Sequence, residues 1–407
     1  MKKKMMKILL MISVFMLLSA TSKLFAAEAG SVAEQFGIKV TWGGAVVMQG
    51  TPKANSTKKN NNNGSNDATY ASSLNITKEF ENNGKIVAKF KVGRGRGLNQ
   101  SLQTYAQVNS DSDHTIDPAN NDVFAKISEL SYQQSFLGNK LTANVGKLNF
   151  KSYFTDNKYA KEFITGAFSG DKVIDKAPPR IALRLNYAAL DKLDISYACF
   201  TNTNLDYFNA KGVNILQAAY KPSKKDNYKV YAWLNNKEDY SSFENNNKKS
   251  GTYGVGISAD KEINKEIGIF GRFSYRDPSV GTDMRVSADT VHPLSMSWNI
   301  GAQMKGSSWS RTNDVAGFAI GQIYGSSYYR KHKKKVMIKE IDENGNKVTE
   351  KDYKDGAEIQ MELYYKFVVS EHIALIPTAQ YLVSPKGGNV ATDDNVFVYG
   401  IRTQFTF

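Results

Sequence analysis

The chain has 407 residues, a formal net charge of +14 and 12% aromatic side chains. A length of this order fits two or three ordinary domains or one large closed sheet. The single cysteine excludes an internal disulfide, and the four dispersed histidines lack the spacing of a zinc or haem site, so neither a disulfide-stapled fold nor a metalloprotein is indicated.

The first thirty residues have the layout of an export signal. Four lysines among the first seven residues precede an apolar core from Ile8 to Leu18, and small residues follow as far as Ala29. This order predicts a secretory signal peptide over residues 1–29, cleaved between residues 22 and 29. The apolar core is short of the roughly 20 residues that a spanning helix needs. An exported chain does not meet cytoplasmic nucleic acid, so the basic excess indicates anionic lipid or anionic solutes as partners.

After the signal peptide, apolar and polar residues alternate in short segments separated by turn residues, which is typical of an outer-membrane β-barrel. The candidate strands are 38–48, 70–80, 85–108, 123–134, 141–148, 180–187, 193–200, 213–220, 227–234, 251–259, 267–275, 296–304, 315–324, 357–368, 372–382 and 396–407. Seven short links alternate with eight long ones between these sixteen segments, as periplasmic turns alternate with outer loops in bacterial barrels.

This count requires that residues 85–108 form one strand. The run GRGRG at 93–97 is then a bend or bulge inside it, because glycine tolerates the dihedral angles involved. A one-residue slip at these glycines is needed to turn Arg94 and Arg96 inward. Splitting the segment would give seventeen strands and reverse the loop pattern. A phosphate-binding interpretation is disfavoured, because the glycine spacing is wrong and no helical pattern follows.

The strand parity predicts a polar, water-filled lumen. Besides Arg94 and Arg96, the residues assigned to the inner face are Arg184, Arg272, Arg276, Glu358, Glu362, Lys366, Arg402 and Gln404. Charged side chains around such a lumen indicate passage of a hydrophilic solute. Glu358 and Glu362 have no nearby His or Ser, so they are interpreted as a charged lining and not as a catalytic pair. No enzymatic activity and no cofactor are predicted.

The last predicted strand, FVYGIRTQFTF, has one apolar face and one polar face. Such a strand is an aggregation hazard if its edge is free. We therefore expect it to pair with the first strand, around IKVTWGGAVVMQ, and to close the barrel.

Several stretches resemble the carbohydrate-selective porin (OprB) family: residues 144–168, 256–276, 297–321 and 361–388, together with the terminal strand. The resemblance implies a 16-stranded outer-membrane barrel that passes sugars by diffusion, with inward-folded loops narrowing the pore. It also implies that Trp309, Arg311 and Asp314, with Arg272, match recurring family positions. A C-terminal aromatic strand resembles the signal read by the outer-membrane insertion machinery.

The sequence therefore predicts an all-β fold, a transmembrane antiparallel up-and-down β-barrel of sixteen strands over residues 30–407. The predicted function is passive diffusion of small hydrophilic solutes, carbohydrates in particular. Expected partners are outer-membrane lipid and lipopolysaccharide, the assembly machinery and sugars, with no nucleic acid, in a monomer or homotrimer. Two alternatives stay open: a general or anion-favouring porin without sugar selectivity, and a structural or adhesive barrel acting through its long loops.

Overall fold

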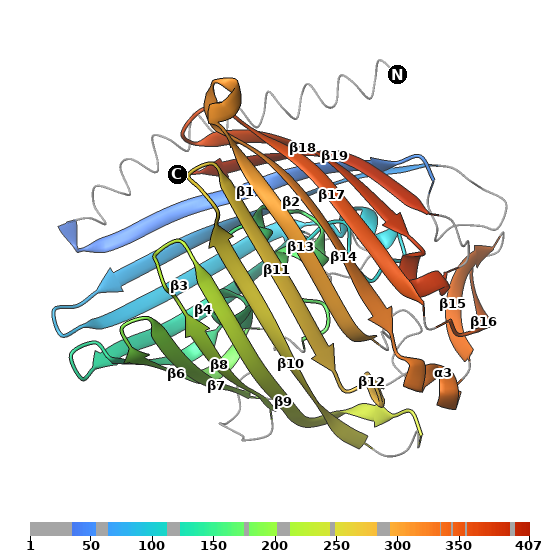
Figure 1. Ribbon diagram of the computed structural model, residues 1–407, viewed down its shortest axis with the longest axis horizontal. Coiled ribbons are helices and arrows are strands. Elements are labelled where there is room, and N and C mark those ends of the chain that lie inside the picture. Colours follow the sequence, from blue (N-terminus) through green and yellow to red (C-terminus); the bar gives the residue numbers. More distant parts are fainter. Residues whose placement is uncertain are drawn as a thin grey trace.

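The computed structural model describes residues 35–53, 64–111, 123–174, 179–201, 212–244, 249–282, 294–333, 335–342, 345–354, 356–390 and 395–407. The predicted signal peptide and its cleavage site lie outside these residues. The described chain forms an antiparallel sheet closed into a barrel, a separate two-stranded hairpin and short helices (Figure 1). No helix in these ranges is long and apolar enough to cross a membrane.

In the described ranges the closed sheet has 17 strands, one of which, β12, is only 3 residues long. The remaining strands confirm the predicted sixteen-stranded barrel. They are β1 Ile38–Thr51, β2 Ser65–Glu79, β3 Gly84–Arg94, β4 Val123–Phe136, β5 Leu141–Leu148, β6 Arg180–Leu190, β7 Leu193–Thr201, β8 Gly212–Tyr220, β9 Asn227–Ser242, β10 Lys249–Glu262, β11 Ile267–Arg276, β13 Leu294–Gly306, β14 Arg311–Gly325, β17 Ala357–Val368, β18 Ile373–Val383 and β19 Val396–Thr406. The short β12, Val280–Thr282, pairs with β9, and β15 Lys335–Asp342 forms a hairpin with β16 Gly345–Asp352.

The barrel closes between its first and last strands. β1 pairs with β19 in an antiparallel register that begins with Gly43 opposite Thr406, and its other edge pairs with β2. Beyond the register, the Trp42 N–H donates to the Phe407 carbonyl at 2.9 Å and the Phe407 N–H donates to the Trp42 carbonyl at 2.7 Å. The predicted seam is confirmed, and it leaves neither terminal strand with a free edge.

Side chains along each strand alternate between the outer surface and the interior. In β19, Phe397 is 43% exposed and Tyr399 is 48% exposed. Val398 and Arg402, which have the opposite parity, are 0% and 4% exposed. The same alternation places large apolar residues outward in the other strands. The outer surface therefore suits lipid, and the inner face of the strands carries polar and charged side chains such as Arg402.

The two ends of the barrel differ in their connections. The short turns between strands lie at the end where the chain terminates, while the β15–β16 hairpin rises at the opposite end (Figure 1). We call these the turn end and the loop end. In bacterial barrels the short turns are periplasmic and the long loops face outward.

The prediction of one strand over residues 85–108 is wrong. β3 ends at Arg94, and its register with β2 runs without a shift through that residue, so the predicted slip at the glycines is absent. Gly95 and Gly97 have φ of +88° and +60°, which lets the chain leave the wall, and a 3-10 helix, Gly97–Gln100, follows. The strand count of sixteen still holds, because the separated half is not a strand.

Two segments enter the barrel from the loop end. We call residues 95–111 inner segment A and residues 149–174 inner segment B. Apolar side chains of segment A pack with inward residues of β13, β14, β18 and β19. The start of segment B and its last residue, Ile174, pack against β6 to β9, and its middle part packs against β11, β14, β17 and β18. The apolar core of the protein thus lies inside the barrel, between these segments and its wall.

Candidate functional site

Charged wall residues hold inner segment B in place. The Arg272 guanidinium on β11 donates to the Phe168 carbonyl at 2.6 Å and to the Thr155 carbonyl at 2.8 Å. Two carbonyls more than ten residues apart in the segment are therefore tied to one side chain. Arg272 is buried, and it contacts the segment and not an open pore.

Two buried glutamates on β17 accept hydrogen bonds from backbone N–H groups of the inner segments. The Glu362 carboxylate accepts hydrogen bonds from the N–H groups of Ile164 and Thr165 at 2.9 and 2.8 Å. The Glu358 carboxylate accepts the N–H groups of Tyr105 and Ala106 in segment A, both at 2.7 Å. Hydrogen bonds to an ionised acceptor are stronger than neutral ones, so these carboxylates fix both segments. They are anchors for inner segments, and neither forms the open charged lining that parity alone predicts.

Wall amides add further anchors. Gln49 of β1 and Gln380 of β18 donate to the same Val108 carbonyl at 2.8 and 3.0 Å. On segment B, Gln303 of β13 donates to the Tyr159 carbonyl at 2.6 Å. These side-chain donors add hydrogen bonds to backbone carbonyls of the inner segments, which allows irregular backbone to lie inside the barrel.

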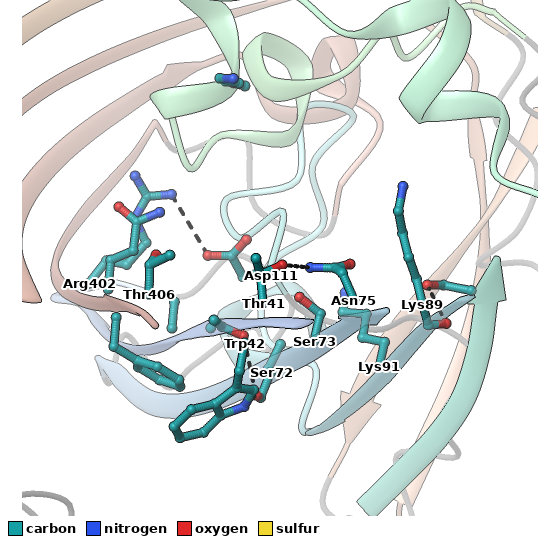
Figure 2. Close-up of a pocket in the computed structure, with 18 of the residues that line it drawn as sticks. Thr41, Trp42, Ser72, Ser73, Asn75, Lys89, Lys91, Asp111, Arg402 and Thr406 are labelled. Carbon is teal, nitrogen blue, oxygen red and sulfur yellow. Dashed lines mark hydrogen bonds and ion pairs between the residues drawn. The ribbon is translucent and has the colours of Figure 1, made fainter. Parts of the chain in front are cut away.

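The inner segments leave one part of the wall open toward the turn end. There a cavity of about 510 Å³ lies against β1, β2, β3 and β19, and segments A and B form its other side. Its lining residues are Thr41, Trp42, Gly43, Gly44, Ala45, Ala71, Ser72, Ser73, Asn75, Lys89, Lys91, Asp111, Ser128, Asn149, Lys161, Arg402, Gln404, Phe405 and Thr406. Figure 2 shows the polar side chains of this wall, with Arg402 and Asp111 directed toward each other. We call this space the wall cavity.

A smaller cavity of about 330 Å³ lies at the turn end between segment B and the turn that joins β10 to β11. Lys366 on β17 lines it and forms an ion pair with Glu162 of segment B at 3.2 Å. Lys161 lines both cavities. Lys366, Arg402 and Gln404 are thus the predicted inner-face residues that the structure places at cavity walls.

The other predicted arginines have different surroundings. Arg184 is half-buried on β6, donates to Asn144 at 3.1 Å and lies 4.9 Å from the centre of the Tyr153 ring. Arg276 is buried near the end of β11 and donates to the Leu294 carbonyl at 3.1 Å. Both point inward, where they bind neighbouring protein groups.

The two arginines of the glycine run do not share an inner-face position. Arg94 lies opposite Tyr70 and Val123, and these two partners are exposed on the outer face. Cross-strand partners share a face, so Arg94 belongs to the outer surface at the loop end and the inward assignment is wrong for it. Arg96 precedes the 3-10 helix of segment A and lies outside any strand.

The three residues of the family resemblance form a network at the turn end. Asp314 on β14 accepts the Arg311 Nε–H at 2.5 Å and the Tyr365 hydroxyl at 2.6 Å, and Trp309 Nε1 donates to that hydroxyl at 2.9 Å. Phe318 and Leu363, which share strand faces with Asp314 and Tyr365, are exposed outward. The network therefore joins the β13–β14 turn to β17 on the outer surface, away from both cavities.

Sequence reasoning missed the lysines of β3. Lys89 and Lys91 line the wall cavity, and they alternate with Ile86, Phe90 and Val92, which are exposed on the outer face. This two-residue period was the available signal. Asp111 and Lys161 were also missed, because they reach the cavity from segments whose inward path has no sequence period.

A closed antiparallel barrel with two anchored inner segments is the arrangement of a porin, and comparison with known proteins agrees. A family model described as the carbohydrate-selective porin, OprB family, matches residues 35–407. The chain belongs to this family. As an OprB-family porin it is an outer-membrane channel protein, and the predicted family resemblance is confirmed.

Solved porin structures share the fold of this OprB-family chain. The high-pH structure of Pseudomonas putida OprB has a TM-score of 0.71 and 16% identity, and the match covers 93% of this chain and 96% of that one. The outer membrane channel DcaP of Acinetobacter baumannii has a TM-score of 0.53 and 12% identity, covering 91% and 98%. An anion-selective porin from Comamonas acidovorans has a TM-score of 0.52 and 9% identity, covering 91% and 99%. A search of curated protein sequences finds no match.

Proposed function

We propose that this porin is a passive diffusion channel for small hydrophilic solutes, carbohydrates in particular. The observation that carries the proposal is the polar wall cavity of about 510 Å³ beside two anchored segments in a closed barrel. Side chains such as Ser73, Asn75 and Gln404 line it and supply hydrogen-bond donors and acceptors for sugar hydroxyls. The family description supports carbohydrate as the solute. Transport then follows the solute gradient, and no catalytic step is assigned.

Conductance in planar bilayers and swelling of proteoliposomes test this function. We expect stepwise channel openings in salt, and swelling rates that fall from a pentose through a hexose to a trisaccharide as solute size approaches the width left by the inner segments. Liposomes that hold the same amount of heat-denatured protein are the control. A reconstituted, folded barrel that neither conducts salt nor passes a pentose would refute the channel and favour an adhesive barrel acting through its loops.

The same experiments distinguish a carbohydrate channel from a general porin. Passage of sugars at rates above those of uncharged polyols of equal size supports a carbohydrate channel. Strong anion selectivity, with sugars passing only according to size, would favour a general anion-favouring porin instead. Both results leave the channel itself intact.

We further propose that residues 1–29 direct export and are removed by cleavage between residues 22 and 29. The mature barrel would then meet the assembly machinery, lipid and lipopolysaccharide in the outer membrane, as a monomer or homotrimer. N-terminal sequencing of the protein from isolated outer membranes tests the cleavage, and an N-terminus at Met1 would refute it. Chemical crosslinking in intact membranes distinguishes a monomer from a trimer.

A further inference from the structure

The network of Trp309, Arg311 and Asp314 holds one arginine in a fixed position on the outer surface at the turn end. The Arg311 guanidinium donates to the Asp314 carboxylate through Nε at 2.5 Å and through Nη2 at 3.3 Å. Nη2 also donates to the Val368 carbonyl at 3.4 Å, and the guanidinium carbon lies 4.1 Å from the centre of the Phe367 ring. A two-point contact with a carboxylate and a contact with an aromatic face together fix the plane of the guanidinium.

The carboxylate of this network is buried and fully occupied. Asp314 also accepts the Tyr365 hydroxyl at 2.6 Å and the Val368 N–H at 2.9 Å, so each of its two oxygens accepts two hydrogen bonds. The Asp314 side chain is 1% exposed, whereas the Arg311 side chain is 43% exposed. Within the described ranges, the Nη1 group of Arg311 donates to no protein acceptor. This group can therefore donate to an acceptor outside the protein.

The surroundings of Arg311 have the composition of a membrane interface. Trp309 donates its indole N–H to the Tyr365 hydroxyl at 2.9 Å, and the centres of the two rings lie 6.1 Å apart. The turn that carries Trp309 is held by Ser307 and Ser308, whose hydroxyls donate to Glu266 at 2.8 and 2.9 Å. Aromatic rings of this kind mark the level of the lipid headgroups on outer-membrane barrels. The guanidinium therefore lies at headgroup level on the periplasmic side.

An exposed apolar surface continues from this level toward the middle of the membrane. Leu363 lies four residues from Phe367 along β17 and pairs with Phe318 of β14. Leu363 is 56% exposed and Phe318 is 48% exposed. Four residues of about 3.3 Å each, along a strand tilted by about 40°, correspond to about 10 Å of depth. A headgroup layer is about 5 to 8 Å thick, so this pair lies among the acyl chains when the guanidinium lies at the level of the phosphates.

From this geometry we propose that Arg311 binds the phosphate group of a phospholipid in the periplasmic leaflet, with the acyl chains of that lipid against Phe318 and Leu363. A phosphate oxygen is a matching acceptor for the Nη1 group, because a hydrogen bond between two charged groups is about twice as strong as a neutral one. Asp314 orients the arginine and is shielded from the headgroup by its burial. The inference goes beyond the proposed channel function and does not depend on which solute passes.

Native mass spectrometry of the purified, folded barrel in detergent measures the lipid preference. Phosphatidylethanolamine, phosphatidylglycerol and diacylglycerol with the same acyl chains are the probes, because only the first two contain a phosphate. We expect the first bound molecule of either phospholipid to be retained at concentrations about tenfold lower than diacylglycerol. Equal retention of all three lipids would refute recognition of the headgroup. Retention of phosphatidylethanolamine alone would refute recognition through the phosphate.

The double variant Arg311→Met, Asp314→Asn locates the site. It removes both charges of the pair, so no uncompensated charge is left at the membrane surface. We expect its phospholipid retention to fall about tenfold, to the level of diacylglycerol. Arg94→Met, on the outer surface at the loop end, is the matched control for loss of an arginine. Heat-modifiable mobility on electrophoresis checks that each variant is folded, and an unchanged phospholipid preference in the folded double variant would overturn the inference.

Thermal unfolding with and without added phospholipid separates lipid binding from a purely structural role of the network. We expect phospholipid to raise the melting temperature of the parent barrel and to leave that of the double variant unchanged, because a ligand stabilises only the protein that binds it. An equal rise in both proteins would refute binding at Arg311. The network lies on the outer surface, so a barrel that conducts no ions would refute the channel function and not this lipid site.

Discussion

Replacing Glu362 with alanine should release inner segment B and widen the channel. The carboxylate accepts the N–H groups of Ile164 and Thr165 at 2.9 and 2.8 Å, and the side chain is 1% exposed. In the variant both N–H groups lose their acceptor inside the barrel. An unsatisfied buried polar group costs about 1–3 kcal/mol, so the loss of two acceptors costs on the order of 2–6 kcal/mol.

Removing a buried charge offsets part of this cost, because the desolvation penalty of the carboxylate disappears with it. We therefore use the lower figure of about 2 kcal/mol, which lowers the ratio of anchored to released segment by roughly thirtyfold. The strand ladder is untouched, so the barrel itself should stay folded. The expected effect is specific to the lumen.

Single-channel recording measures this effect. We expect Glu362→Ala to show a larger mean conductance and frequent fluctuations between levels, with normal heat-modifiable mobility. Glu79→Ala is the matched control, because Glu79 is 73% exposed and pairs with Lys85 at the turn end. A folded Glu362→Ala barrel with unchanged conductance and unchanged current noise would refute the anchoring role of the carboxylate.

Three further changes have defined outcomes. Arg272→Met removes donors to two carbonyls of segment B, so we expect increased conductance and current noise in a folded barrel. Gly268→Ala places a methyl group 2.1 Å from the Tyr159 ring, so we expect overpacking to cost about 1–3 kcal/mol and to lower the melting temperature measured by circular dichroism. Deletion of Phe407 removes the seam bonds to Trp42 and a ring stacked on it at 5.3 Å, so we expect less folded protein in the membrane, with normal conductance for each channel that forms.

Each of these expectations has an outcome that contradicts it. Unchanged conductance and noise in folded Arg272→Met would show that the carbonyl contacts are dispensable. A melting temperature equal to the parent protein in Gly268→Ala would mean that Tyr159 can move aside without loss of packing. Wild-type amounts of folded barrel without Phe407 would remove the C-terminal ring from the assembly step. For the last case, deletion of a loop residue of equal size is the matched control.

The barrel could be predicted from the sequence because its main rule is local. Lipid on one side and protein or water on the other impose a two-residue period, and residues such as Phe397 and Tyr399 carry it. The pairing of the first and last strands could be predicted because a free apolar strand edge promotes aggregation. The lysines Lys89 and Lys91 obey the same period, so their inward position was also within reach of the sequence.

The interior could not be predicted in the same way. Segment A contains apolar residues such as Leu98 and Leu102, and these gave it the appearance of a strand although they pack inside the barrel. The two-residue period of β17 indicates that Glu358 and Glu362 point into the barrel. Their role depends on backbone N–H groups about 200 residues or more away in the chain. No local pattern specifies such partners, so charged residues that looked like open lining proved to be anchors.

The anchors on β17 have a consequence for the order of assembly. The N–H group of Tyr105 is bound by a residue 253 positions later, and that of Ile164 by a residue 198 positions later. Both segments are therefore synthesised long before these two acceptors exist, and a barrel lacking the last three strands would hold them only through the remaining wall residues, such as Gln49 and Arg272. Full anchoring of the inner segments and closure of the sheet become coupled events, so an unfinished barrel would hold its inner segments less firmly than a completed one.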